Sequence, residues 1–170
     1  MRFTYCPDCG TKLVEKEIGD EGMVPFCETC SKPWFDMFST CVIALVINEY
    51  GEAALLRQNY LSNQYHNLVS GYMKPGESAE QTAIREIKEE IGVDVERLEP
   101  AETYWYVRKG MLMIGFFAYG KKVDLTLSGE VDEARWVPVQ ESVNYVHPKG
   151  SISHNLIDAY LEKMGLTESI

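Results

Sequence analysis

Short apolar runs separated by polar turns make up much of the 170-residue chain. The run from Cys41 to Ile47 is continuous, as in a strand buried on both faces, and Ala53 to Gln58 has the pattern of the return strand. Two longer stretches, 99–108 and the strongly apolar 111–120, lie on either side of Lys109-Gly110, which is a turn dipeptide. The pattern therefore predicts two antiparallel strand pairs.

Two stretches instead follow a helical period. Ser78, with Gln81 three residues later, has the spacing of a capping box, and Gly92 stands where a C-terminal cap belongs. We therefore expect a helix from Ala79 to Ile91, with Ile84, Ile87 and Ile91 on the face that packs on a sheet. A second amphipathic helix is expected over 151–164.

The remaining elements are shorter. Residues 121–127 and 134–137 have the composition of further strands, and 60–69 is too polar to assign. His66 is interpreted as a surface or packing residue, and His154 on the last helix as exposed. We therefore expect an α+β fold with a small unit before it.

The first thirty residues contain two C-x2-C pairs, Cys6 with Cys9 and Cys27 with Cys30, separated by seventeen residues. This spacing is typical of a four-cysteine zinc site, and a hairpin formed by 12–18 and 22–26 would complete a zinc ribbon. Four protein ligands leave no open coordination position, which indicates structural zinc. Two disulfides are the alternative, disfavoured in a chain interpreted as cytoplasmic.

Two domains are expected, 1–38 for the ribbon and its linker and 39–170 for the larger domain. In the linker, Trp34 and Phe35 are expected to pack against the larger domain. Cys41 lies outside both cysteine pairs and is interpreted as a buried strand residue.

Charge and hydropathy narrow the functions. The formal net charge is −10, which argues against broad affinity for nucleic acid or for anionic membranes. Met1-Arg2 leads directly into the cysteine motif without the pattern of a signal peptide, and the longest apolar run is far too short to span a membrane. We therefore expect a cytoplasmic protein with no membrane partner.

Three carboxylates share one face of the predicted helix. Glu86, Glu89 and Glu90 fall within a third of a turn of each other, and like charges at this spacing destabilise a helix by a few tenths of a kcal/mol each, an order-of-magnitude figure. A solvated acidic face is the simplest interpretation of the triplet alone. With the glycines, Glu77 and Arg85 at their spacings, divalent cations such as Mg²⁺ or Mn²⁺ become the better explanation.

The segment from Gly71 to Val93, GYMKPGESAEQTAIREIKEEIGV, resembles the signature of the Nudix hydrolases, G-x5-E-x7-R-E-U-x-E-E-x-G-U with U aliphatic. Every fixed position matches. The resemblance implies the Nudix fold, a mixed β-sheet sandwiched between helices, and a metal-dependent hydrolase of a nucleoside diphosphate linked to another moiety. A loop and helix would hold Mg²⁺ or Mn²⁺ against the diphosphate.

A four-cysteine ribbon before such a domain resembles the NADH pyrophosphatase branch of the family. Three further stretches carry the likeness: 130–136 resembles E-x-x-E-A-x-W, 148–157 resembles P-x-x-S-I-A-x-x-L-I, and 111–116 resembles L-M-x-G-F. The branch's S-Q-P-W-P-F-P motif, associated with the choice of nicotinamide dinucleotide, is replaced by Glu102–Arg108, which keeps only the tryptophan.

The resemblance assigns roles to residues. Glu89, Glu90 and Arg85 are expected to be catalytic, with Arg85 orienting the glutamates. The expected ligands of Mg²⁺ or Mn²⁺ are Glu86, Glu89, Glu90 and Glu130. Expected substrate contacts are Gly71, Tyr72, Glu77, Tyr104, Trp105 and Tyr106, with alternation along the strand placing Trp105 on the face opposite Tyr104 and Tyr106. The aromatic cluster can equally be core.

Alternatives remain open for the substrate. A dinucleotide such as NADH, cut to two mononucleotides, is the main expectation, and nucleotide sugars or nucleoside polyphosphates are the rivals. A non-catalytic regulator on a Nudix scaffold would be expected to lack the glutamates and to have a basic ribbon, and neither holds. Pairing of subunits into a homodimer is also expected from the resemblance.

Overall fold

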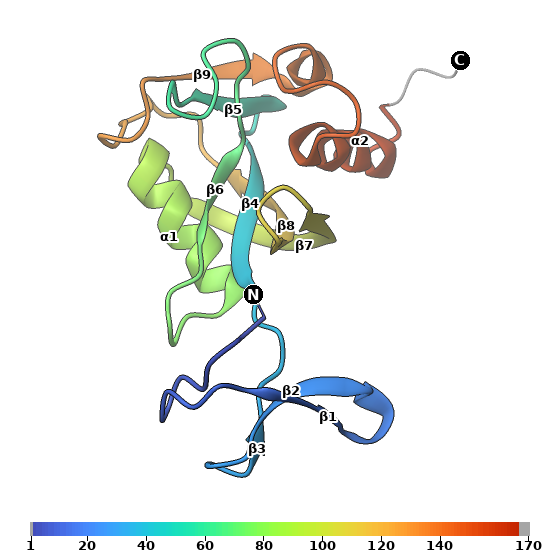
Figure 1. Ribbon diagram of the computed structural model, residues 1–170. Coiled ribbons are helices and arrows are strands. Elements are labelled where there is room, and N and C mark those ends of the chain that lie inside the picture. Colours follow the sequence, from blue (N-terminus) through green and yellow to red (C-terminus); the bar gives the residue numbers. More distant parts are fainter. Residues whose placement is uncertain (1, 167–170) are drawn as a thin grey trace. The chain divides into compact units, whose positions relative to one another are not determined.

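The computed structural model describes residues 2–166, and the chain divides into two compact units, Met1–Ser39 and Thr40–Ile170. The division falls one residue after the expected boundary. Figure 1 shows the elements of both units. Among the described residues, no helix is both long enough and apolar enough to cross a membrane.

The first unit is a small antiparallel sheet in the order β1-β2-β3. Its elements are β1 (Val14–Glu17), the 3-10 turn η1 (Gly19–Glu21), β2 (Met23–Cys27) and β3 (Lys32–Pro33). The predicted hairpin is present, while part of the predicted linker pairs with β2 as a third strand. Trp34 packs edge-on against Phe3 of its own unit, with ring centroids 5.4 Å apart, and its expected contact with the larger domain stays a prediction.

The second unit is built around a six-stranded sheet in the order β7-β8-β4-β5-β9, with β6 pairing with β4. Its strands are β4 (Ser39–Ile47), β5 (Glu52–Arg57), β6 (Val69–Tyr72), β7 (Val95–Tyr106), β8 (Met111–Gly120) and β9 (Glu133–Pro138). Its helices are α1 (Ala79–Ile91), η2 (Val139–Asn144) and α2 (Ile152–Lys163). The predicted hairpin about Lys109-Gly110 is the β7–β8 pair.

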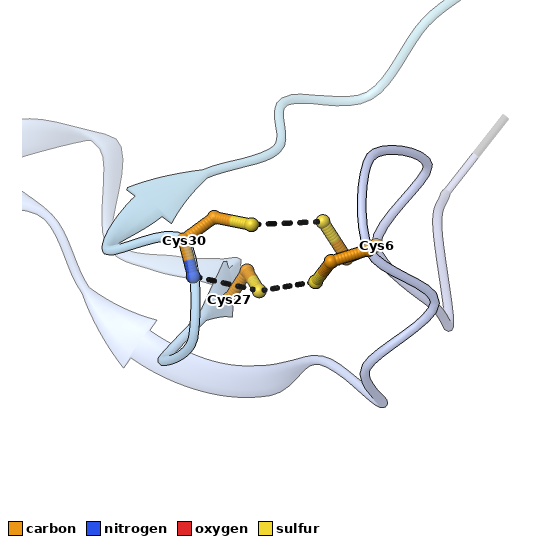
Figure 2. A group of neighbouring side chains, drawn as sticks. Cys6, Cys27 and Cys30 are labelled. Carbon is orange, nitrogen blue, oxygen red and sulfur yellow. Dashed lines mark hydrogen bonds between the residues drawn. The ribbon is translucent and has the colours of Figure 1, made fainter.

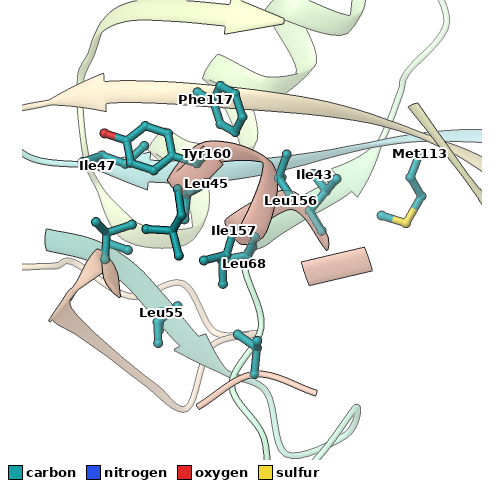
Figure 3. Packing of buried hydrophobic residues seen from close by; sticks show 14 of the residues in the cluster. Ile43, Leu45, Ile47, Leu55, Leu68, Met113, Phe117, Leu156, Ile157 and Tyr160 are labelled. Atoms are coloured by element: carbon teal, nitrogen blue, oxygen red, sulfur yellow. The ribbon is translucent and has the colours of Figure 1, made fainter. Parts of the chain in front are cut away.

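Strand β4 belongs to two hydrophobic cores, because alternate side chains of a strand point to opposite faces. Ile43 and Leu45 pack in the core that includes Leu156 and Ile157 of α2, which Figure 3 shows from close by. Val42, Ala44 and Val46 pack in the other core, with Ala83, Ile87 and Ile91 of α1. The sheet therefore lies between α1 and α2, as Figure 1 shows, which is the arrangement expected from the sequence.

Several predictions for individual elements were wrong. Residues 121–127 form no strand, since Thr126 N–H donates to Ile91 O at 3.1 Å, at the C-terminal end of α1. Ile84, expected on the packing face of α1, is 45% exposed. His154, expected to be exposed, has a side chain only 17% exposed, with Nε2 3.4 Å from Asp158 Oδ2. For His66, by contrast, one of the two interpretations holds, since it is a buried packing residue.

Candidate active site

The four ribbon cysteines form a compact sulfur cluster, most of which is visible in Figure 2. Their Sγ atoms all lie within 4.8 Å of one another, with Cys6 to Cys30 at 3.9 Å and Cys9 to Cys27 at 3.5 Å. Tetrahedral zinc with Zn–S bonds of about 2.3 Å requires S···S separations of about 3.8 Å, whereas a disulfide requires about 2.05 Å. All four cysteines are free thiols here, and the geometry fits a metal ion.

The second site begins with the loop and helix of residues 71–92. Ser78 Oγ accepts from the Gln81 N–H and the Gln81 side chain accepts from the Ser78 N–H, completing the predicted capping box. Gly92 ends α1 in the left-handed conformation at φ 74°, where an L side chain would be strained. These caps fix the ends of α1 and therefore the positions of the carboxylates along it.

Arg85 holds the acidic residues of this site together. Its Nε and Nη2 donate to the two oxygens of Glu77 at 2.7 and 2.9 Å, and its Nη1 donates to Glu86 at 2.7 Å and to Glu89 at 2.9 Å. The Arg85 guanidinium lowers the pKa of Glu77 to about 2. Nη2 also lies 3.3 Å from the Tyr72 carbonyl oxygen, so one side chain connects β6, the loop and the helix.

Glu86 lies directly against the backbone of β6. A Cβ added to Gly71 would stand 2.0 Å from Glu86 Cδ, so only glycine leaves room for the carboxylate there. The Glu86 side chain is 14% exposed. The first glycine of the sequence motif therefore has a steric reason in this structure.

Glu90 is the most buried carboxylate of the site, at 5% exposure. Gln58 Nε2 donates to Glu90 Oε1 at 3.3 Å, while Glu90 Oε2 has no partner in the described part of the chain. Burial, reinforced by the nearby charge of Glu86, raises the pKa of Glu90 to about 8. A buried oxygen without a donor is where a bound cation would be expected.

These groups open onto a cavity of about 1260 Å³ in the second unit. The acidic residues that line it are Glu86, Glu89, Glu90 and Glu130. The basic residues that line it are Lys74, Arg85, Arg108, Lys109 and Lys149. Pockets for small-molecule ligands commonly measure about 300–1,000 Å³, so this one has room for a nucleotide-sized ligand.

The structure brings together most, but not all, of the predicted substrate contacts. Gly71, Tyr72, Trp105 and Tyr106 line the cavity. Tyr104 does not, because its side chain packs against the core that contains α2. Trp105 is 53% exposed, so the predicted alternation between Tyr104 and Trp105 is present.

Glu77 also lies outside the cavity lining. Both of its oxygens accept from Arg85, and Thr82 Oγ1 and the Lys74 N–H donate to Oε2 at 2.9 and 3.1 Å. Its carboxylate is therefore occupied by the protein itself. The expected substrate contact of Glu77 stays a prediction, and the contacts within the protein show that this carboxylate positions Arg85.

Sequence reasoning missed Gln58 and Thr82. Gln58 is 2% exposed and follows the apolar run of β5, and a polar residue at the end of a buried strand was the available signal. Thr82, fully buried on the first turn of α1, had no signal in the sequence because its role depends on where Glu77 lies.

The NUDIX domain family matches residues 37–158, which is well over half of the chain. The chain belongs to the NUDIX family. The expected membership of the Nudix family and the expected Nudix fold, a mixed sheet with few helices, are thereby confirmed.

Individual relatives agree. The chain is 28% identical over 168 residues to the NAD-capped RNA hydrolase NudC of Stutzerimonas stutzeri strain A1501, covering 98% of this chain and 59% of that protein. It is 30% identical over 162 residues to the NAD-capped RNA hydrolase NudC of Pseudomonas aeruginosa strain LESB58, covering 94% of this chain and 56% of that one. The chain therefore spans 56 to 59% of these relatives' length.

Among solved structures, a NUDIX hydrolase from Nitrosomonas europaea superposes with a TM-score of 0.71 at 21% identity, covering 96% of this chain and 93% of that one. At this identity the likeness supports the fold. Coverage of nearly the whole chain includes the small N-terminal sheet as well as the larger unit.

Proposed function

We propose that this Nudix protein is a metal-dependent pyrophosphohydrolase that cuts the diphosphate of a dinucleotide of the NADH type into two mononucleotides. The observation that carries the proposal is the arrangement of Glu86 and Glu90. Both carboxylates are held in the wall of one nucleotide-sized cavity, one against Gly71 and the other with an unpartnered buried oxygen. A solvated acidic face would have neither feature.

The residues fit Mg²⁺ or Mn²⁺, which prefer carboxylate oxygens. Glu86, Glu89 and Glu90 would hold the metal, with Glu130 facing the same cavity. When bound, the metal supplies charge neutralisation at the diphosphate and an acidified water. Arg85 keeps Glu86 and Glu89 in place by the hydrogen bonds described above, and we assign it to positioning.

Glu90 would enter the metal site as a carboxylate. Without a cation, burial raises its pKa to about 8, and a cation at Oε2, which has no hydrogen-bond partner in the described part of the chain, would favour the charged form. Gln58 fixes the orientation of the other oxygen. Tyr72, Trp105 and Tyr106 provide flat surfaces along the cavity on which a base can stack.

We also propose that the cysteine cluster holds one structural zinc ion. The sulfur separations support this, and a sheet of three short strands can bury too little apolar surface to fold without it. The homodimer and the cytoplasmic location expected from the sequence remain predictions, and sedimentation velocity tests the first.

The test is a side-by-side measurement of kcat/KM with Mg²⁺ and with Mn²⁺ for NADH, NAD⁺, ADP-ribose and a dNTP. We expect the dinucleotides to be cut at the diphosphate, with two mononucleotides as products. A tenfold preference for a sugar nucleotide or a dNTP, about 1.4 kcal/mol of transition-state stabilisation, would overturn the dinucleotide assignment. Because the similar proteins are named NAD-capped RNA hydrolases, an NAD-capped oligonucleotide belongs in the same panel.

The Glu90→Gln variant distinguishes hydrolysis by this protein from hydrolysis by a contaminating enzyme. It preserves shape and the contact with Gln58 but removes the charge, so turnover should fall by at least about 10³-fold while the fold persists. Near-normal activity of this variant on any substrate of the wild type would contradict the role assigned to Glu90. Circular dichroism serves as the check on folding.

A further inference from the structure

Three basic side chains around the cavity lack the partners that most other cations of this protein have. Ten of the sixteen lysines and arginines contact a carboxylate within 4.0 Å in the described part of the chain. Arg108, Lys109 and Lys149 are cavity-lining residues that are not among the ten. The protein has 26 acidic residues, so a shortage of carboxylates does not explain this.

The three come from two segments that meet at the same core. Arg108 and Lys109 lie in the turn 107–110 between β7 and β8, and Lys149 lies three residues before Ile152 of α2. Tyr106 and Ile152 both pack against the core beneath α2. The hairpin turn and the segment before α2 therefore border the cavity together, although they are about forty residues apart in sequence.

The other two basic side chains that line the cavity, Arg85 and Lys74, already contact carboxylates. Arg85 is bound to Glu77, Glu86 and Glu89, and Lys74 Nζ lies 4.0 Å from Glu89 Oε1. The cavity therefore has an acidic region around Glu86, Glu89 and Glu90. It also has a basic region whose exposed cations contact no carboxylate within 4.0 Å in the described part of the chain. The acidic region takes the diphosphate through its metal, so the basic region is left for a different anion.

We propose that Arg108, Lys109 and Lys149 form a subsite for a phosphate monoester that the substrate carries on a ribose, in addition to its diphosphate. This inference rests on the proposed function. The guanidinium of Arg108 offers a planar fork that suits phosphate, and the two lysines add point charges. A base stacked on the exposed ring of Trp105 would place its ribose near residues 107–109, which follow shortly after on the chain.

Binding without catalysis gives the first test. The probes are adenosine 2′,5′-bisphosphate and AMP, which differ by one ribose phosphate, titrated calorimetrically into the full zinc-loaded chain without Mg²⁺ or Mn²⁺. We expect the bisphosphate to bind at least tenfold more tightly at low ionic strength and the preference to shrink as salt is added. Equal affinities would overturn the proposal.

The variant is Arg108→Gln/Lys149→Gln, with Lys12→Gln/Lys16→Gln on the ribbon unit as a control that changes the net charge equally. The first should lose most of the preference for the bisphosphate, and the control should keep it. An equal loss in both would show that net charge, not a subsite, sets the preference, and would overturn the proposal.

Kinetics give the second test, using NADPH and NADH, which differ by the same phosphate. In the Arg108→Gln/Lys149→Gln variant, kcat/KM for NADPH should fall about tenfold more than kcat/KM for NADH. Equal losses for both substrates would mean that these cations serve the diphosphate, which overturns the subsite. If neither dinucleotide is hydrolysed by the wild type, the proposed function fails, and the binding measurement still decides the subsite.

Discussion

Arg85 shows how one side chain organises several acidic residues. Its guanidinium contacts three carboxylates and a backbone carbonyl, so it both offsets their mutual repulsion and fixes their directions. A lysine at this position could keep the charge but not the bidentate contact with Glu77. The precision of the site therefore depends on the shape of the guanidinium as much as on its charge.

The ion pair between Arg85 and Glu77 predicts a specific pH dependence of the free energy of unfolding. The pKa of Glu77 is lowered from an ordinary value of 4.5 to about 2, so its contribution is fully present above about pH 4.5 and is lost as the pH falls towards 2. The Glu77→Gln variant lacks this contribution at every pH. Urea unfolding at pH 7, 4 and 3 should therefore show the gap between wild type and variant narrowing with acid, and a constant gap would contradict the assignment.

Gly71→Ala should disable the site without unfolding the protein. The added Cβ would meet the carboxylate end of Glu86, which can rotate away, so the fold persists while one expected metal ligand is displaced. We expect kcat/KM to fall about 10²-fold or more, the scale of losing one oriented catalytic group.

Combining Gly71→Ala with Glu86→Asp provides the control. The shorter acid relieves part of the clash, so the double variant should be more active than the additive effect of the two single substitutions. Strict additivity would argue against the contact between the two positions.

Among the elements, α1 could be predicted most fully from sequence. Its boundaries depend on Ser78, Gln81 and Gly92, which act within one turn of the helix ends and need no distant partner. Residues 121–127 could not be predicted, because their backbone groups bond to distant parts of the fold and not to a neighbouring strand: Thr126 N–H donates to Ile91 O, and Lys122 N–H donates to the Glu49 carboxylate. Alternation along β7 predicted opposite faces for Tyr104 and Trp105, but which face meets the core and which lines the cavity depends on tertiary packing.

The N-cap of α1 yields a quantitative prediction. Ser78→Ala removes the acceptor for the Gln81 N–H and should destabilise the second unit by about 1 kcal/mol, whereas Ser78→Gly should cost only a few tenths of a kcal/mol. Chemical denaturation of the three proteins measures both differences. Equal losses for Ala and Gly would indicate that the hydroxyl's contact with Glu80, and not the cap, matters.

At the scale of the molecule, the two compact units should respond differently to loss of zinc. Hydrogen exchange after chelation, or in the Cys6→Ser variant, should show lost protection in β1, β2 and β3 and retained protection in β4 and β5, because the second unit has its own hydrophobic cores. Elemental analysis of the untreated protein should give one zinc per chain. Protection lost equally in both units would contradict their independence.

Strand β4 has a consequence for cooperativity within the second unit. Its side chains belong to both hydrophobic cores. A cavity created on the α2 side therefore destabilises the same strand on which α1 packs. Helix α2 carries none of the four acidic residues assigned to the metal. Its loss would nevertheless expose one apolar face of the sheet to water. The packing of α2 therefore supports the positions of the α1 carboxylates from the other side of the sheet, and we expect substitutions beneath α2 to lower their affinity for the metal that we propose they hold.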